Sequence, residues 1–151
     1  MLEGIVLDDL LNKSDTINGA TVWSAVKPIV ESTGPVKTVK VIELPGHSSR
    51  LMLLPGDIKL SDFEADLNEF WRECFQRKRR GFIGTMAFSQ LVNDICESKD
   101  TDYVFYDSGP NIGALNRSIL LDCDYFAVPV SYDLFSVRAL QTLGRSLFIL
   151  L

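Results

Sequence analysis

Asp107 is the residue whose type and surroundings point most directly to chemistry. It ends the apolar run "YVFYD" (residues 103–107), and the small and turn-forming residues "SGPNIG" (residues 108–113) follow it. A carboxylate at the end of a buried strand can hold Mg²⁺, directly or through a water molecule, and glycines let backbone approach a phosphate. The spacing equally allows Asp107 to cap a helix that opens near Asn111 or Ala114. The residues alone leave both interpretations open.

The elements that must position Asp107 predict an α/β fold. Residues 101–107 and 123–130 have the composition of strands, and residues 114–122 and 136–151 have that of helices. Strands that alternate with helices build a parallel sheet flanked by helices, and ligands bind at the carboxyl ends of its strands. We therefore expect Asp107 at a ligand-binding edge.

The first half of the chain predicts further helices and two strands. Thr21 is expected to cap a helix in which Pro28 causes a kink or an early end. Ser61 and Glu64 have the spacing of a capping box. No linker or repeat is evident, so residues 1–151 are expected to form one domain. The expected helices cover residues 2–11, 22–33, 62–80 and 85–98, the strands cover residues 36–46 and 50–57, and the stripe of residues 62–80 that faces the core is Phe63, Leu67, Phe70, Trp71 and Cys74.

Composition narrows the class of protein. The chain has 151 residues, 46% of them hydrophobic and 23% charged, as in globular domains. A formal charge of −5 argues against a general nucleic-acid-binding surface but allows a local basic patch. The three cysteines show no metal-ligand spacing, and His47 is the single histidine. With no signal-peptide pattern and no apolar run of membrane-spanning length, we expect a cytoplasmic protein with reduced cysteines.

The densest basic run is "QRKRRG", residues 76–81. Its cations, Arg77, Lys78, Arg79 and Arg80, are candidates for non-specific contact with DNA phosphates. The alternative is a solvated helix end at which the helix dipole favours cations, and the acidic net charge of the chain favours this alternative.

Residues 103–147 resemble the ParA/MinD-type (deviant-Walker, SIMIBI-class) family of P-loop ATPases. The resemblance lies in the strand that ends at Asp107, in the loop with Pro110, Asn111 and Gly113, and in "AVPV" with Pro129 before "FSVRAL". The earlier segments "TVWSAVKPIVE" and "LMLLPGDIKLSDFEADL" resemble the family in the same order along the chain.

The resemblance implies roles for particular residues. Asp107 matches the Walker B acid, which binds Mg²⁺. Ser108, Gly109, Pro110 and Asn111 match the switch II loop that senses the γ-phosphate. Pro129 matches the segment that borders the nucleotide. ATP and Mg²⁺ are thus the cofactors implied for an intact parent, and no catalytic base or lysine aligns.

The chain departs from the family at the phosphate site. Neither Gly-Lys-Ser nor Gly-Lys-Thr occurs in it, so the Walker A loop, whose amides and lysine bind the phosphates, has no counterpart. We therefore expect the central to C-terminal part of a ParA-like ATPase, a partial P-loop fold that does not hydrolyse or tightly bind ATP alone. A missing central strand leaves sheet edges that a homodimer or strand exchange would cover.

Two functions from different classes follow. The first is a partitioning-type ATPase domain whose parent uses ATP to switch dimerisation and position DNA or another cargo, with a partitioning protein as a possible partner. The second is a non-catalytic interaction module on the same scaffold. A receiver-type phosphoacceptor domain ranks below both, because the paired acids and late lysine of such domains are missing.

Overall fold

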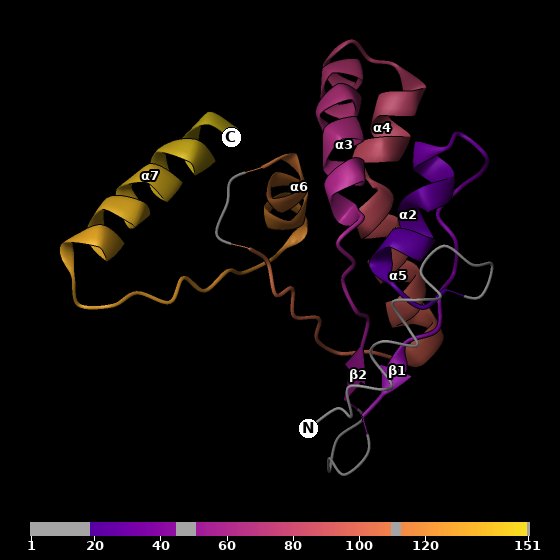
Figure 1. Ribbon diagram of the computed structural model, residues 1–151, viewed down its shortest axis with the longest axis horizontal. Coiled ribbons are helices and arrows are strands. Elements are labelled where there is room, and N and C mark those ends of the chain that lie inside the picture. Colours follow the sequence, from indigo (N-terminus) through magenta and orange to yellow (C-terminus); the bar gives the residue numbers. More distant parts are fainter. Residues whose placement is uncertain (1–18, 45–50, 110–112, 151) are drawn as a thin grey trace. The chain divides into compact units, whose positions relative to one another are not determined.

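The structure of the chain is a computed structural model that describes residues 19–44, 51–109 and 113–150 (Figure 1). The chain divides into two compact units, Met1–Phe105 and Tyr106–Leu151. The helix expected over residues 2–11 lies outside the described residues, as does His47. None of the described helices has both the length and the apolar character needed to cross a lipid bilayer.

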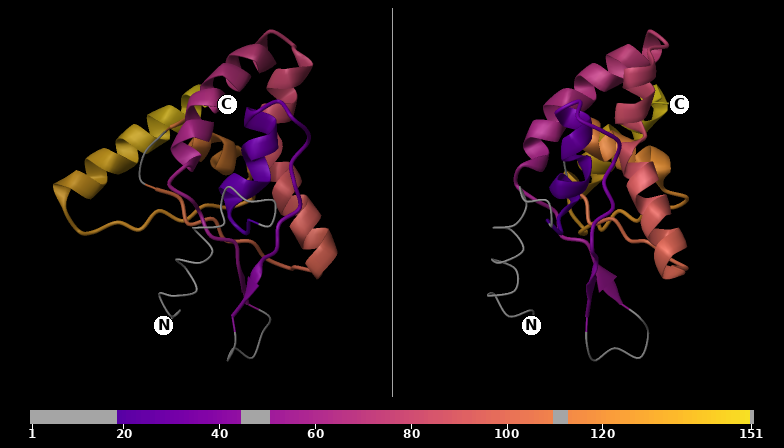
Figure 2. Two further views of the ribbon diagram at one scale, coloured as in Figure 1. Left: turned by 45° about the vertical axis from the view of Figure 1, so that its right-hand side comes forward. Right: turned by 90° about the vertical axis from the view of Figure 1, so that its right-hand side faces the viewer.

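The first unit is helical with a small antiparallel ribbon. Ile42 pairs with Leu53 across the ribbon. The ribbon and the connection between α3 and α4 lie at opposite ends of this unit in both views of Figure 2. Its elements are α2 (Val22–Val30), β1 (Ile42–Glu43), β2 (Met52–Leu53), α3 (Leu60–Phe75), α4 (Arg79–Thr85) and α5 (Ala87–Lys99).

Helix α3 supplies the centre of the core of the first unit. Phe63, Leu67 and Phe70 have no exposed surface, which confirms the expected stripe, while Trp71 and Cys74 at its edge are half-buried. The Phe63 ring lies 5.5 Å from that of Phe88 on α5. Aromatic rings at this separation pack favourably, so the stripe joins α3 to α5.

Helix α2 begins as the sequence predicts. The Thr21 hydroxyl accepts a 3.2 Å hydrogen bond from the Ser24 amide and donates one of 3.2 Å to Asp57. Pro28 lies in the last turn, and α2 ends two residues later at Val30. The cap thus also links α2 to the chain that leads into α3.

The expected capping box at Ser61 is wrong. Helix α3 starts at Leu60, two residues before the expected start at residue 62, and its N-cap residue is Lys59, which makes no side-chain cap. The Asp57 carboxylate instead accepts a hydrogen bond of 3.0 Å from the Lys59 amide. Because Asp57 forms a turn ahead of Ser61, the helix has already begun at Leu60. Ser61 therefore lies inside α3 and is not its N-cap residue.

The helix expected over residues 62–80 is two helices. Helix α3 ends at Phe75, and α4 folds back against it. Gly81 and Gly84 make this possible. A Cβ atom on Gly81 would lie 2.7 Å from the Phe70 carbonyl oxygen, and one on Gly84 would overlap the Phe70 ring. The absence of side chains therefore sets how closely the two helices approach.

The second unit contains α6 (Ala114–Asp122) and α7 (Leu134–Leu150) joined by irregular chain. Both helices were expected. Asp133 caps α7, because its carboxylate accepts a 2.7 Å hydrogen bond from the Ser136 amide. The capping carboxylate fixes where α7 begins, two residues earlier than the pattern indicated.

The expected parallel sheet is not present in the described part of the chain. The sheet there is the two-stranded antiparallel ribbon of β1 and β2, and residues 103–107 and 123–130 form no strand. Strands require a neighbouring backbone to satisfy their amides and carbonyls, and apolar composition alone does not supply one. The observed class is a helix-rich mixture of α and β structure.

Candidate functional site

The Asp107 loop lies ahead of α6 in the second unit. Asp107, Ser108 and Gly109 are exposed and irregular, whereas Pro110 and Asn111 lie outside the described residues. The N-cap residue of α6 is Gly113, so Asp107 is not the cap. A capping side chain must stand directly before the first turn.

Asn116 anchors this loop to α6. Its side chain is buried, and its Nδ2 atom donates a hydrogen bond of 2.7 Å to the Gly109 carbonyl. Asn116 was not among the residues expected from the sequence. The available signal was a poor helix former in the first turn of a predicted helix, where an amide often bonds backbone outside the helix.

Tyr106 anchors the chain on the other side of Asp107. Its hydroxyl donates a 2.6 Å hydrogen bond to the carboxylate of Asp122, the last residue of α6. Bonds to the two ends of one helix therefore hold residues 106 and 109. Asp107 lies between these two anchored residues, and it is exposed to solvent.

One exposed carboxylate fits the contribution that a Walker B acid makes to a magnesium site. Mg²⁺ in P-loop enzymes is bound largely by nucleotide phosphates, waters and a Ser or Thr, with an acid that completes the set. Among the described residues there is no group of three or more His, Cys, Asp or Glu placed to hold a metal ion. Asp107 could thus join a nucleotide-bound Mg²⁺ but could not bind the ion without other ligands.

Pro129, the other residue matched to nucleotide binding, lies in the irregular chain between α6 and α7. It is exposed, as are the apolar residues on either side of it, Val128 and Val130.

Cys123 is the first residue of this connection. Burial raises the pKa of its thiol, and the nearby carboxylates of Asp122 and Asp124 add to the increase. A raised pKa disfavours the thiolate, so Cys123 is a poor nucleophile at neutral pH.

The basic run crosses the turn between α3 and α4. Arg77 lies in the turn, Lys78 is the N-cap residue of α4, and Arg79 and Arg80 occupy its first turn. Arg77 and Lys78 directly follow the C-terminus of α3, where the helix dipole favours cations, whereas Arg79 and Arg80 lie at the N-terminus of α4, where it does not, so both interpretations of the basic run stay open. Arg80 is engaged within the unit: it lies 3.1 Å from the Glu73 carboxylate and stacks 4.8 Å over the Phe70 ring.

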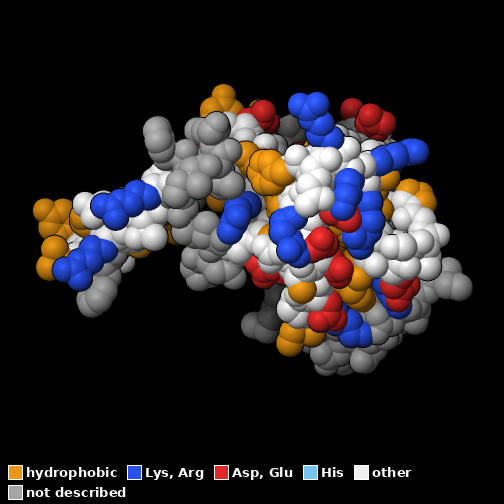
Figure 3. Space-filling view, turned by 90° about the horizontal axis from the view of Figure 1, so that it is seen from above, with side chains coloured by type: hydrophobic (Ala, Val, Ile, Leu, Met, Phe, Trp, Pro, Cys, Tyr) orange, Lys and Arg blue, Asp and Glu red, His pale blue; other side chains and the backbone are white. Residues whose placement is uncertain are grey.

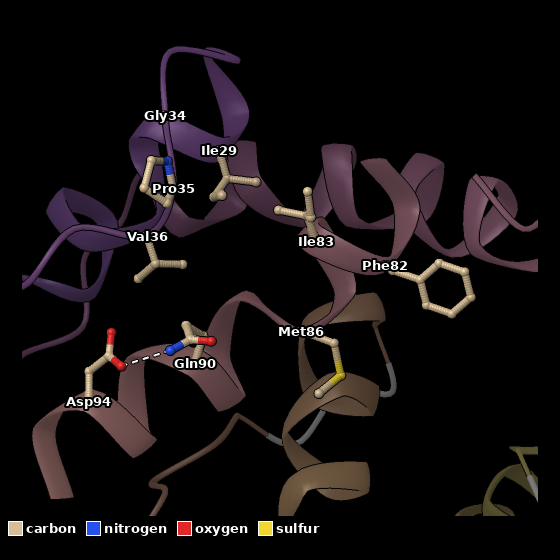
Figure 4. A pocket seen from close by; sticks show the side chains of 9 residues that line it. All are labelled: Ile29, Gly34, Pro35, Val36, Phe82, Ile83, Met86, Gln90 and Asp94. Atoms are coloured by element: carbon tan, nitrogen blue, oxygen red, sulfur yellow. Dashed lines mark hydrogen bonds between the residues drawn. The ribbon is translucent and has the colours of Figure 1, made fainter. Parts of the chain in front are cut away.

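A groove of about 700 Å³ lies between α2, α4 and α5 (Figure 4). Ile29, Val36, Ile83 and Met86 give it an apolar lining, and a 2.7 Å hydrogen bond from Gln90 to Asp94 marks its polar end. Its lining brings no acid–base pair or nucleophile together, so it offers binding surface and no evident chemistry.

Comparison with solved structures finds protein DIP2308 from Corynebacterium diphtheriae. The two are 28% identical with a TM-score of 0.76, and the match covers 95% of this chain and 47% of the other. This chain therefore spans about half the length of that protein. No curated protein matches.

The model of the AAA domain family matches residues 11–148, which include the Asp107 loop, the Pro129 segment and most of both units. The match agrees with the resemblance drawn from Asp107, Pro129 and their neighbours. This chain belongs to the AAA domain family of ParA/MinD-like P-loop ATPases.

Proposed function

We propose that the chain is the acid-bearing part of a ParA/MinD-type ATPase. In this proposal the intact protein binds ATP with Mg²⁺, and hydrolysis switches its dimerisation so that it positions DNA or another cargo. The observation that carries the proposal is the family match together with the fixed and exposed placement of Asp107.

Within this proposal the residues divide the work. Asp107 would hold the nucleotide-bound Mg²⁺, and the ion would neutralise charge on the phosphates. Ser108, Gly109, Pro110 and Asn111 follow the state of the γ-phosphate, and Asn116 keeps that loop attached to α6. Pro129 borders the nucleotide. The chain alone does not turn over ATP, because it has no Gly-Lys-Ser or Gly-Lys-Thr loop.

The proposal also concerns the fold. Residues 103–107 and 123–130 become neighbouring strands of a parallel sheet when the P-loop strand is supplied, and a homodimer is the state that ATP stabilises. The apolar residues of these segments support this, because Tyr103, Phe105 and Tyr125 are largely exposed in the chain as it stands.

A non-catalytic interaction module is the second candidate. The observation that favours it is the lack of a Walker A run anywhere in the sequence. In this case the Asp107 loop keeps its anchors at Tyr106 and Asn116 for stability, and nucleotide has no effect on the protein.

Titration with a fluorescent ATP analogue separates the two candidates. The chain is tested with and without Mg²⁺, alone and after addition of a P-loop segment from a ParA-like relative, with Asp107→Asn as the matched variant. Mg²⁺-dependent binding that needs the added segment and Asp107 supports the ATPase proposal. Equal signals for the wild type and Asp107→Asn in every condition favour the interaction module.

A further inference from the structure

The connection between α3 and α4 is a compact basic turn, referred to here as the hairpin tip (residues 75–79). The amide of Arg77 donates to the Cys74 carbonyl at 2.8 Å, and that of Lys78 donates to the Glu73 carbonyl at 3.0 Å. These two bonds form a Schellman motif at the end of α3. The tip is therefore a hydrogen-bonded element of defined shape.

Each cation of the hairpin tip occupies a position where local structure favours a different residue. Arg77 has a φ of 59°, at the position where glycine usually ends a Schellman motif. Lys78 is an N-cap residue without a side-chain cap, where Ser, Thr, Asp or Asn is preferred. Arg79 lies at the positive end of the α4 dipole. Three consecutive positions thus carry a cation where the local backbone suits another residue type better. This indicates that the positive charge serves a function other than folding.

The charge of the tip is available for binding. Arg77, Lys78 and Arg79 are exposed, and the described ion pairs include none of the three, in contrast to Arg80 with Glu73. No acidic residue occurs between residues 74 and 93. Figure 3 looks onto this end of the first unit and shows several Lys and Arg side chains there, with Asp and Glu side chains among them.

An aromatic side chain accompanies the cations. Phe75, the last residue of α3, is 82% exposed and lies two residues before Arg77. Phosphate contacts along duplex DNA gain nothing from an exposed phenyl ring, whereas peripheral membrane binding combines a basic patch with an apolar anchor. The pairing of Phe75 with three free cations favours a lipid surface.

We propose that the hairpin tip binds an anionic phospholipid surface, with Arg77, Lys78 and Arg79 attracting the headgroups and Phe75 entering the interface. This site is independent of nucleotide and of the Asp107 loop, so it stands or falls separately from the ATPase proposal. It would give the chain a point of attachment to a membrane surface.

The experiment measures co-flotation of the 151-residue chain with vesicles. One set is phosphatidylcholine alone, and the other contains roughly one-third phosphatidylserine. The expected result is partitioning onto the anionic set only. Replacing Arg77, Lys78 and Arg79 together by Gln should lower partitioning on the order of a hundredfold, because each cation contributes about a fivefold gain. Phe75→Ser should lower it by about tenfold.

The matched control removes the same charge elsewhere. Lys40, Arg138 and Arg145 are exposed and lie outside the tip, and replacing all three by Gln should leave partitioning within about twofold of the wild type. An equal loss in this control, or equal binding to both vesicle sets, would overturn the proposal. So would duplex DNA binding that needs the tip cations, remains unchanged in Phe75→Ser, and has no vesicle counterpart.

Arg77→Gly guards against a misfolded variant. Glycine adopts the left-handed conformation of this position without the cost that Arg77 bears, so the variant should unfold at a higher temperature than the wild type. It should nevertheless bind anionic vesicles about fivefold more weakly. A variant that is more stable but binds vesicles more weakly is expected only if Arg77 contacts the lipid surface. Unchanged vesicle binding would count against the site.

Discussion

Replacing Gly81 by alanine tests the packing of the α3–α4 hairpin. The added Cβ atom would lie 2.6 Å from the Glu73 carbonyl carbon and 2.7 Å from the Phe70 carbonyl oxygen, both backbone atoms of α3. Backbone cannot rotate away as a side chain can, so α4 must move off α3. That movement would uncover Phe70, which is fully buried.

The magnitude follows from two opposing terms. Alanine in place of glycine inside a helix gains about 1 kcal/mol of helix propensity. Overpacking costs about 1–3 kcal/mol, and a contact with fixed backbone belongs at the upper end. The net effect is a loss of about 2 kcal/mol in the free energy of unfolding, or roughly 4–8 °C in Tm for a chain of this size.

Tryptophan fluorescence during urea unfolding provides the assay. Trp23 and Trp71, the two tryptophans of the chain, both belong to the first unit, so their signal reports on that unit. Gly144→Ala is the control, because Gly144 lies in α7 and no heavy atom stands within 4 Å of its added Cβ. Circular dichroism should show this variant equal to or slightly more stable than the wild type. A Gly81→Ala protein as stable as the wild type would refute the close approach of α3 and α4.

Three further predictions concern capping, the loop anchor and the thiol. Thr21→Val should lower stability by about 1–2 kcal/mol because the capping hydroxyl is lost, and Thr21→Ser should restore most of it, as judged by urea midpoints. Asn116→Ala leaves the Gly109 carbonyl without its donor, so hydrogen exchange of α6 amides should become faster, with a loss of about 1–2 kcal/mol; unchanged exchange would mean that the anchor is dispensable. Cys123 should be alkylated with a pH profile displaced to higher pH than that of free cysteine, because its pKa is raised. Asp124→Asn should move this profile toward lower pH, and a shift the other way would contradict the assigned cause.

Local signals were enough to predict most of the helices. Thr21 predicts the start of α2 because its capping hydroxyl bonds to an amide only three residues away. The helical spacing of Phe63, Leu67 and Phe70 predicts α3 without any information from the rest of the chain. Ser61 misled because Asp57, which lies outside the capping pattern, forms a competing turn. The turn at Asp57 determines where α3 begins, and the spacing of Ser61 and Glu64 carries no information about that turn.

The features that failed depend on partners distant in sequence. Nothing in the sequence around Gly81 and Gly84 indicates a helix–helix contact. Their role becomes visible only in the structure, where Phe70 of α3 lies against them. Asn116 resembles an ordinary exposed amide until its bond to Gly109 is seen. Of the candidate site, the sequence located Asp107 and its loop, while the anchors on either side of it appeared only in three dimensions.

The irregular connection between α6 and α7 has a consequence for handling the protein. Proteases cleave preferentially in exposed loops. Tyr125 and Phe126 are 91% and 57% exposed in a segment without helix or strand. Chymotrypsin, which cuts after aromatic residues, should cut in this segment, and also after Tyr103 and Phe105, which are 81% and 94% exposed in the irregular chain ahead of the Asp107 loop. A cut after Tyr125 or Phe126 separates α7, with Arg138 and Arg145, from the part of the chain that carries the Asp107 loop and α6, whereas a cut after Phe105 separates that loop from the first unit.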